Sequence, residues 1–259
     1  MNATAPIIRA RGIVNRFGAQ LVHDGIGLDI AAGEIVGIAG GSGSGKSVLL
    51  KTLTGLRRPD AGEVQLEGRA VDAIDGSHRA SLFGVLFQHG ALFSSLTLAQ
   101  NVMLPLREHT DLPEALRQRI AAMKLELAGL PAASGSKFPA ELSGGMIKRA
   151  ALARALALDP RILFLDEPTA NLDPPTAAGI DALITQLNRG LGITVIVVTH
   201  DLMTLVNVCH RVAVLVDGRI VAGTVARLMH SQDPWIRELL HGPRARGATT
   251  AGRAAHGIR

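Results

Sequence analysis

The sequence predicts an α/β fold: a parallel sheet covered by helices, an antiparallel β subdomain at the N-terminal end and an inserted helical subdomain. Three observations support this prediction. Apolar runs of strand length alternate with helical stretches, short strands with glycine turns fill the first thirty residues, and helical spacing dominates from Leu96 to about Ala157. With 259 residues, 47% of them hydrophobic, the chain can bury one substantial core.

The N-terminal part predicts two short strands, Ile7–Val14 and Leu21–Ile30, broken by glycines. Glu34–Ala39 is a compact apolar run typical of a buried parallel strand. A glycine-rich loop and a helix over Lys46–Gly55 follow it directly. Proline and glycine on both sides of Glu63–Glu67 indicate a hairpin strand there.

The rest of the chain predicts an inserted helical block and then renewed alternation. The expected helices of the block are Leu98–Leu106, Pro113–Ala128 and Gly144–Leu158. The later strands are Ile162–Leu165, Thr194–Val198, Arg211–Val216 and Arg219–Ala222. The later helices are Pro175–Arg189, Leu202–Val208, Val225–His230 and Pro234–Leu240. This order is typical of a parallel sheet with right-handed crossovers.

Composition and charge exclude several classes of protein. Cys209 is the only cysteine and cannot form an internal disulfide, which favours a reducing compartment. No apolar run approaches the roughly 18 residues of a membrane-spanning helix, and Met1–Arg11 lacks the apolar segment of a signal peptide. The net charge is +5, and four arginines without an acidic residue lie in residues 242–259, which we expect to be a disordered basic tail. The remainder is nearly neutral, which argues against a nucleic-acid partner.

The glycine-rich loop predicts phosphate binding. It fits G-x-x-x-x-G-K-[ST] and consists of Gly40, Gly41, Ser42, Gly43, Ser44, Gly45, Lys46 and Ser47. Glycines let the backbone curl around phosphate oxygens, and the helix N-terminus supplies partial positive charge. Lys46 can reach the β- and γ-phosphates, and the Ser47 hydroxyl can ligate Mg²⁺.

A second signal, a pair of acidic residues, follows the strand Ile162–Leu165. Asp166 and Glu167 follow it, and the carboxyl ends of parallel strands face the ligand crevice of such a sheet. We expect Asp166 to hold Mg²⁺ and Glu167 to polarise the water that attacks the γ-phosphate. An apolar strand ending in two acids is by itself an ordinary strand edge, and the glycine loop is what favours the functional reading.

Ser143, Gly144 and Gly145 open the helix rich in alanine and arginine. Such a sequence can provide a second anion-binding nest, and by itself it is more often a helix-capping serine with loop glycines. The order of motifs favours the nest. A phosphate loop, Gln88, Leu-Ser-Gly-Gly, Asp-Glu and Thr199-His200-Asp201 follow one another along the chain.

On these motifs, residues 7 to 240 resemble the nucleotide-binding subunit of an ATP-binding cassette (ABC) transporter. The resemblance implies a P-loop NTPase (RecA-like) core over about 1–90 and 159–241, a helical subdomain over about 91–158, and one ATPase domain over 1–241. Gly40–Ser47 look like the Walker A loop and Leu142–Met146 like the signature motif.

The resemblance also implies residue roles. The catalytic residues would be Glu167, His200 as the switch histidine, and Gln88 of the Q-loop. The metal ligands would be Ser47, Gln88 and Asp166. ATP would contact Phe17, which stands where the family often has tyrosine, together with Gly40, Gly41, Ser42, Gly43, Ser44, Gly45, Lys46, Ser47, Val48, Ser143, Gly144, Gly145 and the D-loop residue Asp173.

Met146 stands where the signature motif usually has glutamine. At this position and over residues 88–113, the sequence resembles the Mla/Mce-type branch of the family. This branch moves phospholipids between bacterial envelope membranes. It implies a second copy of the chain, a membrane permease (MlaE-like), an MCE-domain lipid-binding protein (MlaD-like) and a small STAS-domain protein (MlaB-like) as partners. It also implies a peripheral location on the cytoplasmic face of the inner membrane.

Two other readings stay open at this point. The first is a soluble ABC protein with a mechanical or scaffold role in repair, translation or cluster assembly. Tandem cassettes or a long coiled-coil insertion usually accompany that role, and neither fits in this length. The second is a small-molecule kinase, in which the Ser-Gly-Gly nest and His200 would have no purpose.

Overall fold

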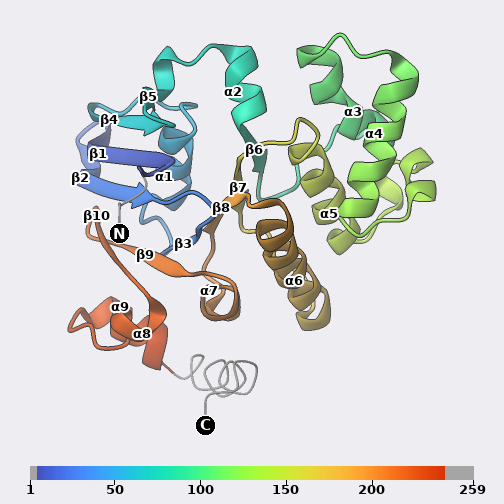
Figure 1. Cartoon of the computed structure of the whole chain (residues 1–259). Helices are drawn as coiled ribbons and strands as arrows, with labels where there is room; N and C mark the ends of the chain where they lie inside the picture. Colours follow the sequence, from blue (N-terminus) through green and yellow to red (C-terminus); the bar gives the residue numbers. More distant parts are fainter. Residues whose placement is uncertain (1–4, 243–259) are drawn as a thin grey trace. The chain divides into compact units, whose positions relative to one another are not determined.

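The computed structural model describes residues 5–242, which form two compact units (Figure 1). Unit 1 combines the described residues up to Ile74 with those from Ile196 onward, and unit 2 is Asp75–Val195. The predicted basic tail lies, from residue 243 on, outside the described residues. Within residues 5–242 every helix is too short or too polar to cross a lipid bilayer.

Unit 1 contains the predicted antiparallel sheet. Its strand order is β2-β1-β4-β5, with β1 at Ile8–Phe17, β2 at Gln20–Ile30, β4 at Ala61–Leu66 and β5 at Arg69–Ala70. A short 3₁₀ turn, Val71–Ala73, follows β5. Ile8 lies opposite both Ile30 of β2 and Leu66 of β4, and all three are buried. This cross-strand apolar contact sets the register of the three strands.

The second sheet of unit 1 is mixed. Four of its strands have the order β10-β9-β3-β8, where β3 is Ile35–Gly40, β8 is Thr194–Val198, β9 is Arg211–Val216 and β10 is Arg219–Gly223. β3 and β9 are parallel, as predicted. β10 is antiparallel to β9 because Asp217 and Gly218, both at positive φ, form a two-residue hairpin turn. The sheet is therefore mostly, not wholly, parallel.

The helices of unit 1 are α1 at Lys46–Leu53, α7 at Leu202–Asn207, α8 at Val225–Leu228 and α9 at Pro234–His241. Leu205 of α7 and Ile236 of α9 pack with Ala39 and Val214 in one buried cluster. This cluster supports β3 at the point where it ends in the glycine-rich loop.

Unit 2, all of which the structure describes, contains two parallel strands and five α-helices. β6 at Phe83–Leu86 is parallel to β7 at Ile162–Asp166, and each strand leads into residues that the sequence analysis singled out, Gln88 after β6 and Asp166 with Glu167 at the end of β7. Gly84 of β6 lies so close to α5 that a Cβ there would come within 2.0 Å of the Ala155 carbonyl oxygen. The helices are α2 at Gly76–Leu82, α3 at Leu98–His109, α4 at Glu114–Leu127, α5 at Gly144–Ala155 and α6 at Pro174–Leu191, with 3₁₀ turns at Ala132–Ser136 and Pro139–Glu141.

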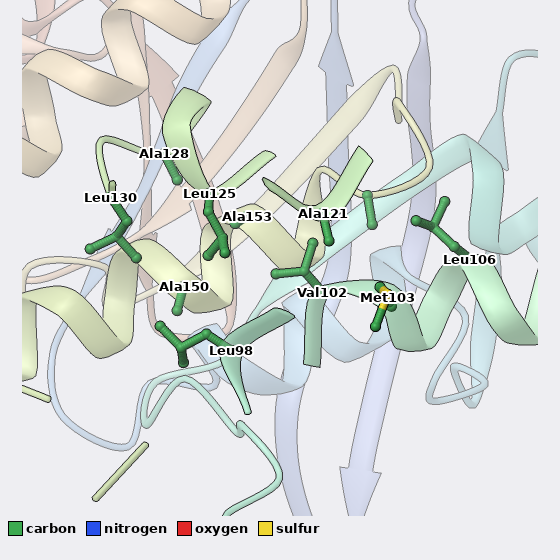
Figure 2. Close-up of a cluster of buried hydrophobic side chains, with 11 residues drawn as sticks. Leu98, Val102, Met103, Leu106, Ala121, Leu125, Ala128, Leu130, Ala150 and Ala153 are labelled. Atoms are coloured by element: carbon green, nitrogen blue, oxygen red, sulfur yellow. The ribbon is translucent and has the colours of Figure 1, made fainter. Parts of the chain in front are cut away.

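Helices α3, α4 and α5 form the predicted helical subdomain. Figure 2 shows side chains from all three meeting in one apolar cluster, including Leu98, Val102, Leu125 and Ala150. The small alanines of α5 let the other two helices approach it closely. Helix α3 begins with a capping box in which Thr97 accepts from the Gln100 backbone and the Gln100 side chain accepts from Thr97.

Candidate functional site

The glycine-rich loop lies between β3 and α1, as the sequence predicts. Gly43 and Gly45 have φ of 74° and 98°, a left-handed conformation that favours glycine. Ser42, Gly43 and Ser47 are exposed, so the outer side of the loop is open to a ligand. Lys46 Nζ donates to the carbonyl oxygens of Gly40 and Gly41, 2.8 Å each, which holds its ammonium group at the loop.

Neighbouring side chains approach two of the loop glycines closely, and a third lies beside a tryptophan. A Cβ on Gly40 would lie 2.6 Å from Ser44 Oγ, and one on Gly45 would lie 2.5 Å from Val22 Cγ1. A Cβ on Gly41 would touch the indole of Trp235, 3.4 Å from Nε1. The loop therefore forms a compact cradle at the start of α1, where backbone N–H groups and the helix N-terminus favour an anionic ligand.

Two other predicted residues of unit 1 lie at the surface. Phe17 ends β1 with 48% of its side chain exposed, and the Arg57 guanidinium carbon lies 4.1 Å from the centre of its ring. His200 is exposed after β8, in a turn fixed by Asp201, which caps α7. The backbone N–H of Asp201 donates to Thr199 Oγ1 over 3.0 Å. An exposed ring and an exposed imidazole on a rigid turn are both suited to ligand contact.

In unit 2, Asp166 and Glu167 end β7 and are more than nine-tenths buried. Glu167 has φ of 48°, an uncommon conformation for a residue with a side chain and one that clusters at functional sites.

Lys148 of α5 connects this acidic pair to the Q-loop. It is buried, and Nζ donates to the Gln88 carbonyl oxygen and, over 2.8 Å, to the Glu167 carbonyl oxygen. Burial lowers the pKa of Lys148, and the charges of Asp166 and Glu167 act to raise it. Sequence reasoning missed this residue. The available signal was a lysine on the face of α5 that otherwise carries small buried residues.

The signature motif opens α5 in an exposed position. Ser143 is the N-cap, and its hydroxyl accepts from the backbone N–H of Met146 over 3.3 Å. Gly145 is buried, and a Cβ there would lie 2.4 Å from Thr176 Cγ2. Met146 packs against the helical core. The capping reading and the anion-nest reading are compatible, because Ser143 and Gly144 both remain exposed.

Gln88 and Asp173 are exposed residues of unit 2. Gln88 follows β6, and Lys148 holds its backbone. Asp173 caps α6, where its carboxylate accepts from the Thr176 backbone N–H over 3.1 Å. Hydrogen bonds from Thr176 lower the pKa of Asp173. The structure thus assigns Asp173 a helix-capping role that the sequence motif did not indicate.

Each unit contains a part of the predicted site. Unit 1 holds the phosphate loop, Phe17 and His200, and unit 2 holds the acidic pair, Gln88 and the signature motif. The candidate metal ligands Ser47, Asp166 and Gln88 supply only oxygen donors, which suit Mg²⁺. No cluster of three histidine, cysteine or acidic side chains occurs in residues 5–242, so an ion held here would rely on substrate phosphates as well.

A phosphate loop after a buried strand, a strand ending in Asp-Glu and a signature motif at a helix start define an ATP-binding cassette. The sequence pattern of the family described as "ABC transporter" matches residues 23–170. The chain belongs to this family and is an ATP-hydrolysing subunit of an ABC transporter.

Among curated relatives, the chain is 38% identical over 240 residues to an intermembrane phospholipid transport system ATP-binding protein, MlaF of Haemophilus influenzae, covering 91% of this chain and 90% of that one. It is 42% identical over 243 residues to the probable ribonucleotide transport ATP-binding protein mkl of Mycobacterium leprae, covering 92% of this chain and 69% of that one.

Two solved structures are also similar. A dimeric ATP-binding cassette in a post-hydrolysis state with ADP and phosphate aligns with a TM-score of 0.77 at 32% identity, covering 84% of this chain and 98% of that one. The protein cbiO1 of Clostridium perfringens, part of the ABC transporter complex cbiONQ, aligns with a TM-score of 0.79 at 28% identity, covering 96% and 100%.

Proposed function

We propose that this chain powers phospholipid trafficking between bacterial envelope membranes, as a peripheral ATPase at the cytoplasmic face of the inner membrane. The observation that carries the proposal is the similarity to MlaF proteins, which spans nine-tenths of both chains. Residues 88–113 and Met146 support the same branch. The relative named for ribonucleotide transport makes that cargo the second candidate.

In the proposed mechanism two copies of the chain face each other head to tail. The phosphates of ATP bind the loop Gly40–Ser47 of one copy and the exposed Ser143 and Gly144 of the other. The positive ends of α1 and α5 both favour the phosphate charge. ATP thus joins two surfaces, and its hydrolysis separates them, which is a ligand-driven population shift.

Within each site, Glu167 orients the attacking water as general base, and His200 contacts the γ-phosphate. The ring of Phe17 stacks on adenine. Gln88 contacts the bound nucleotide, and the D-loop residue Asp173 lies beside the nucleotide. Ser47, Gln88 and Asp166 would hold Mg²⁺, which neutralises phosphate charge when it is bound. The φ of Glu167 and its link to Lys148 support the choice of Glu167 as base.

The partner surface that we propose is an apolar groove in unit 2. The groove has a volume of about 510 Å³, and its lining includes Phe87, Phe93, Leu104 and Pro105. Phe87 and Phe93 are 37% and 51% exposed, which is unusual for such large apolar side chains. We assign the groove to a helix of an MlaE-like permease, and we expect an MlaD-like and an MlaB-like protein in the same assembly.

Co-purification tests this function. The full chain, expressed in its native host with a C-terminal affinity tag, should elute with a polytopic membrane protein and an MCE-domain protein, with phospholipid bound to the complex. A Phe93→Asp variant should lose these proteins and keep ATP binding, while Leu116→Asp, an exposed apolar position outside the groove, should keep them. Elution with ribosomes, with DNA, or with a permease that carries ribonucleotides would contradict the proposal.

A further inference from the structure

A buried polar chain lies behind the phosphate loop in unit 1. Asn15 of β1, His23 of β2 and Thr52 of α1 are completely buried. Asn15 and His23 are cross-strand partners, and Asn15 Nδ2 lies 2.9 Å from His23 Nδ1 and 3.1 Å from Thr52 Oγ1. Polar side chains are rare at such positions unless each has a hydrogen-bonding role.

The hydrogen bonds of this chain place the proton of His23. Arg57 Nε donates to Asn15 Oδ1 over 3.2 Å, so the amide nitrogen of Asn15 faces His23 and Thr52. Thr52 Oγ1 donates to the Val48 carbonyl oxygen and therefore accepts from Asn15. An amide nitrogen only donates, so His23 Nδ1 accepts, and the proton of the neutral ring is on Nε2.

The Nε2–H group of His23 faces the phosphate loop. A Cβ on Gly45 would lie 2.7 Å from Nε2, which is buried, makes no hydrogen bond of full geometry within residues 5–242, and has the Gly45 backbone as its neighbour. Burial lowers the pKa of His23, the Gly45 backbone acts to raise it, and the charge of Arg57 lowers it further. A buried N–H without a well-formed hydrogen bond costs free energy, and the Gly45 backbone is the group beside it that can offset that cost.

Gly45 is the residue whose backbone most needs support. It precedes Lys46, has φ of 98°, and its carbonyl oxygen accepts the first helical hydrogen bond, from Leu49, over 2.8 Å. Without a side chain of its own, it has nothing to restrain that conformation except its neighbours. A small rotation of its peptide would redirect Lys46 and the N–H groups at the start of α1.

We propose that His23 is a positioning residue for the phosphate loop, and that its Nε2–H supports the Gly45 backbone and so sets the direction of Lys46. This inference rests on the proposed binding of ATP phosphates by Gly40–Ser47. Asn15 holds the imidazole ring in the required orientation. Arg57 joins the same chain to the exposed ring of Phe17, so one network supports both the phosphate loop and the residue that we expect to stack on adenine.

The test compares three variants of the full chain. His23→Leu removes both ring nitrogens, and His23→Gln keeps an N–H at the same number of bonds from the backbone. The double change Asn15→Leu with His23→Leu replaces both partners by apolar groups. Arg57 loses Asn15 as an acceptor but keeps the Arg16 carbonyl oxygen and Asp60, so the double variant should fold even where His23→Leu does not. ATP affinity is read from the fluorescence of Trp235, the only tryptophan, which lies against Gly41. The KM for ATP and kcat are measured on the assembled transporter.

The positioning role predicts that the double variant has the same unfolding temperature as the native chain. Its Kd and KM for ATP should be raised roughly tenfold, which is the effect expected from the loss of one hydrogen bond. His23→Gln should restore most of the affinity. Native affinity in a folded double variant, or no rescue by His23→Gln, would overturn the inference. Absence of ATP binding by the native chain would instead refute the proposed function, so the two failures are distinct.

Discussion

Lys148→Met is the substitution from which we expect the most information about the acidic half of the site. It removes the two hydrogen bonds from Nζ to the carbonyl oxygens of Gln88 and Glu167. Hydrogen bonds to a charged group contribute about 1.5–3 kcal/mol each, and release of a buried charge offsets part of the loss. We therefore expect a decrease of about 2–4 kcal/mol in the free energy of unfolding and a decrease of at least about tenfold in kcat.

Lys124→Met is the matched control. Lys124 is also a buried lysine of unit 2, and it pairs with Asp159, which lies outside the proposed site. Both variants should be less stable in urea unfolding, and only Lys148→Met should lose ATPase activity in the assembled transporter at temperatures where both are folded. Equal activity of the two folded variants would refute the reasoning that Lys148 positions Glu167.

Three further outcomes follow from the structure. Glu167→Gln should reduce phosphate release by at least about a thousandfold while ATP still binds, since it removes the base and keeps the shape; near-native release would assign the base elsewhere. Gly84→Ala should cost more than about 3 kcal/mol of stability, because its Cβ would lie 2.0 Å from the Ala155 carbonyl oxygen; a native urea midpoint would show that the strand can shift. The folded pKa of His23 lies below its ordinary 6.5, so the unfolded chain binds more protons just below that pH, and stability should rise with pH there by at most about 1.4 kcal/mol per unit. A variant with Asn15→Leu and His23→Leu should lose that part of the slope, and an unchanged slope in urea titrations would contradict the assignment.

Much of the fold was predictable because its signals are local. The alternation of buried strands and helices after Pro160, and the buried run before Gly40, give their elements within a few residues. The antiparallel position of β10 depends on a two-residue turn at Asp217 and Gly218, and a pattern of apolar residues carries no strand direction. Helix α2 was not predicted, because its seven residues carry no apolar period and only Asp75 marks its start.

The candidate site was predictable where the chemistry lies in one segment of the chain. The phosphate loop, Asp166 with Glu167, and Ser143 were all assigned from short motifs, and their roles stay predictions. The residues that hold them were not found. Lys148 and His23 each contact partners distant in sequence. The small residues around Lys148 on α5 were the one signal in its own segment, and they do not name its partners. Hydrogen bonds between residues that are distant in sequence can be identified only once the arrangement of the folded elements is known.

The central claim is that ATP joins two copies of the chain through the loop of one and Ser143 of the other. Size-exclusion chromatography with light scattering of Glu167→Gln, with and without Mg-ATP, tests it most directly when compared with Glu167→Gln carrying Ser143→Arg. The account predicts an ATP-dependent dimer for the first variant. For the second it predicts a monomer that still binds ATP by Trp235 fluorescence. An ATP-dependent dimer that survives Ser143→Arg would contradict it.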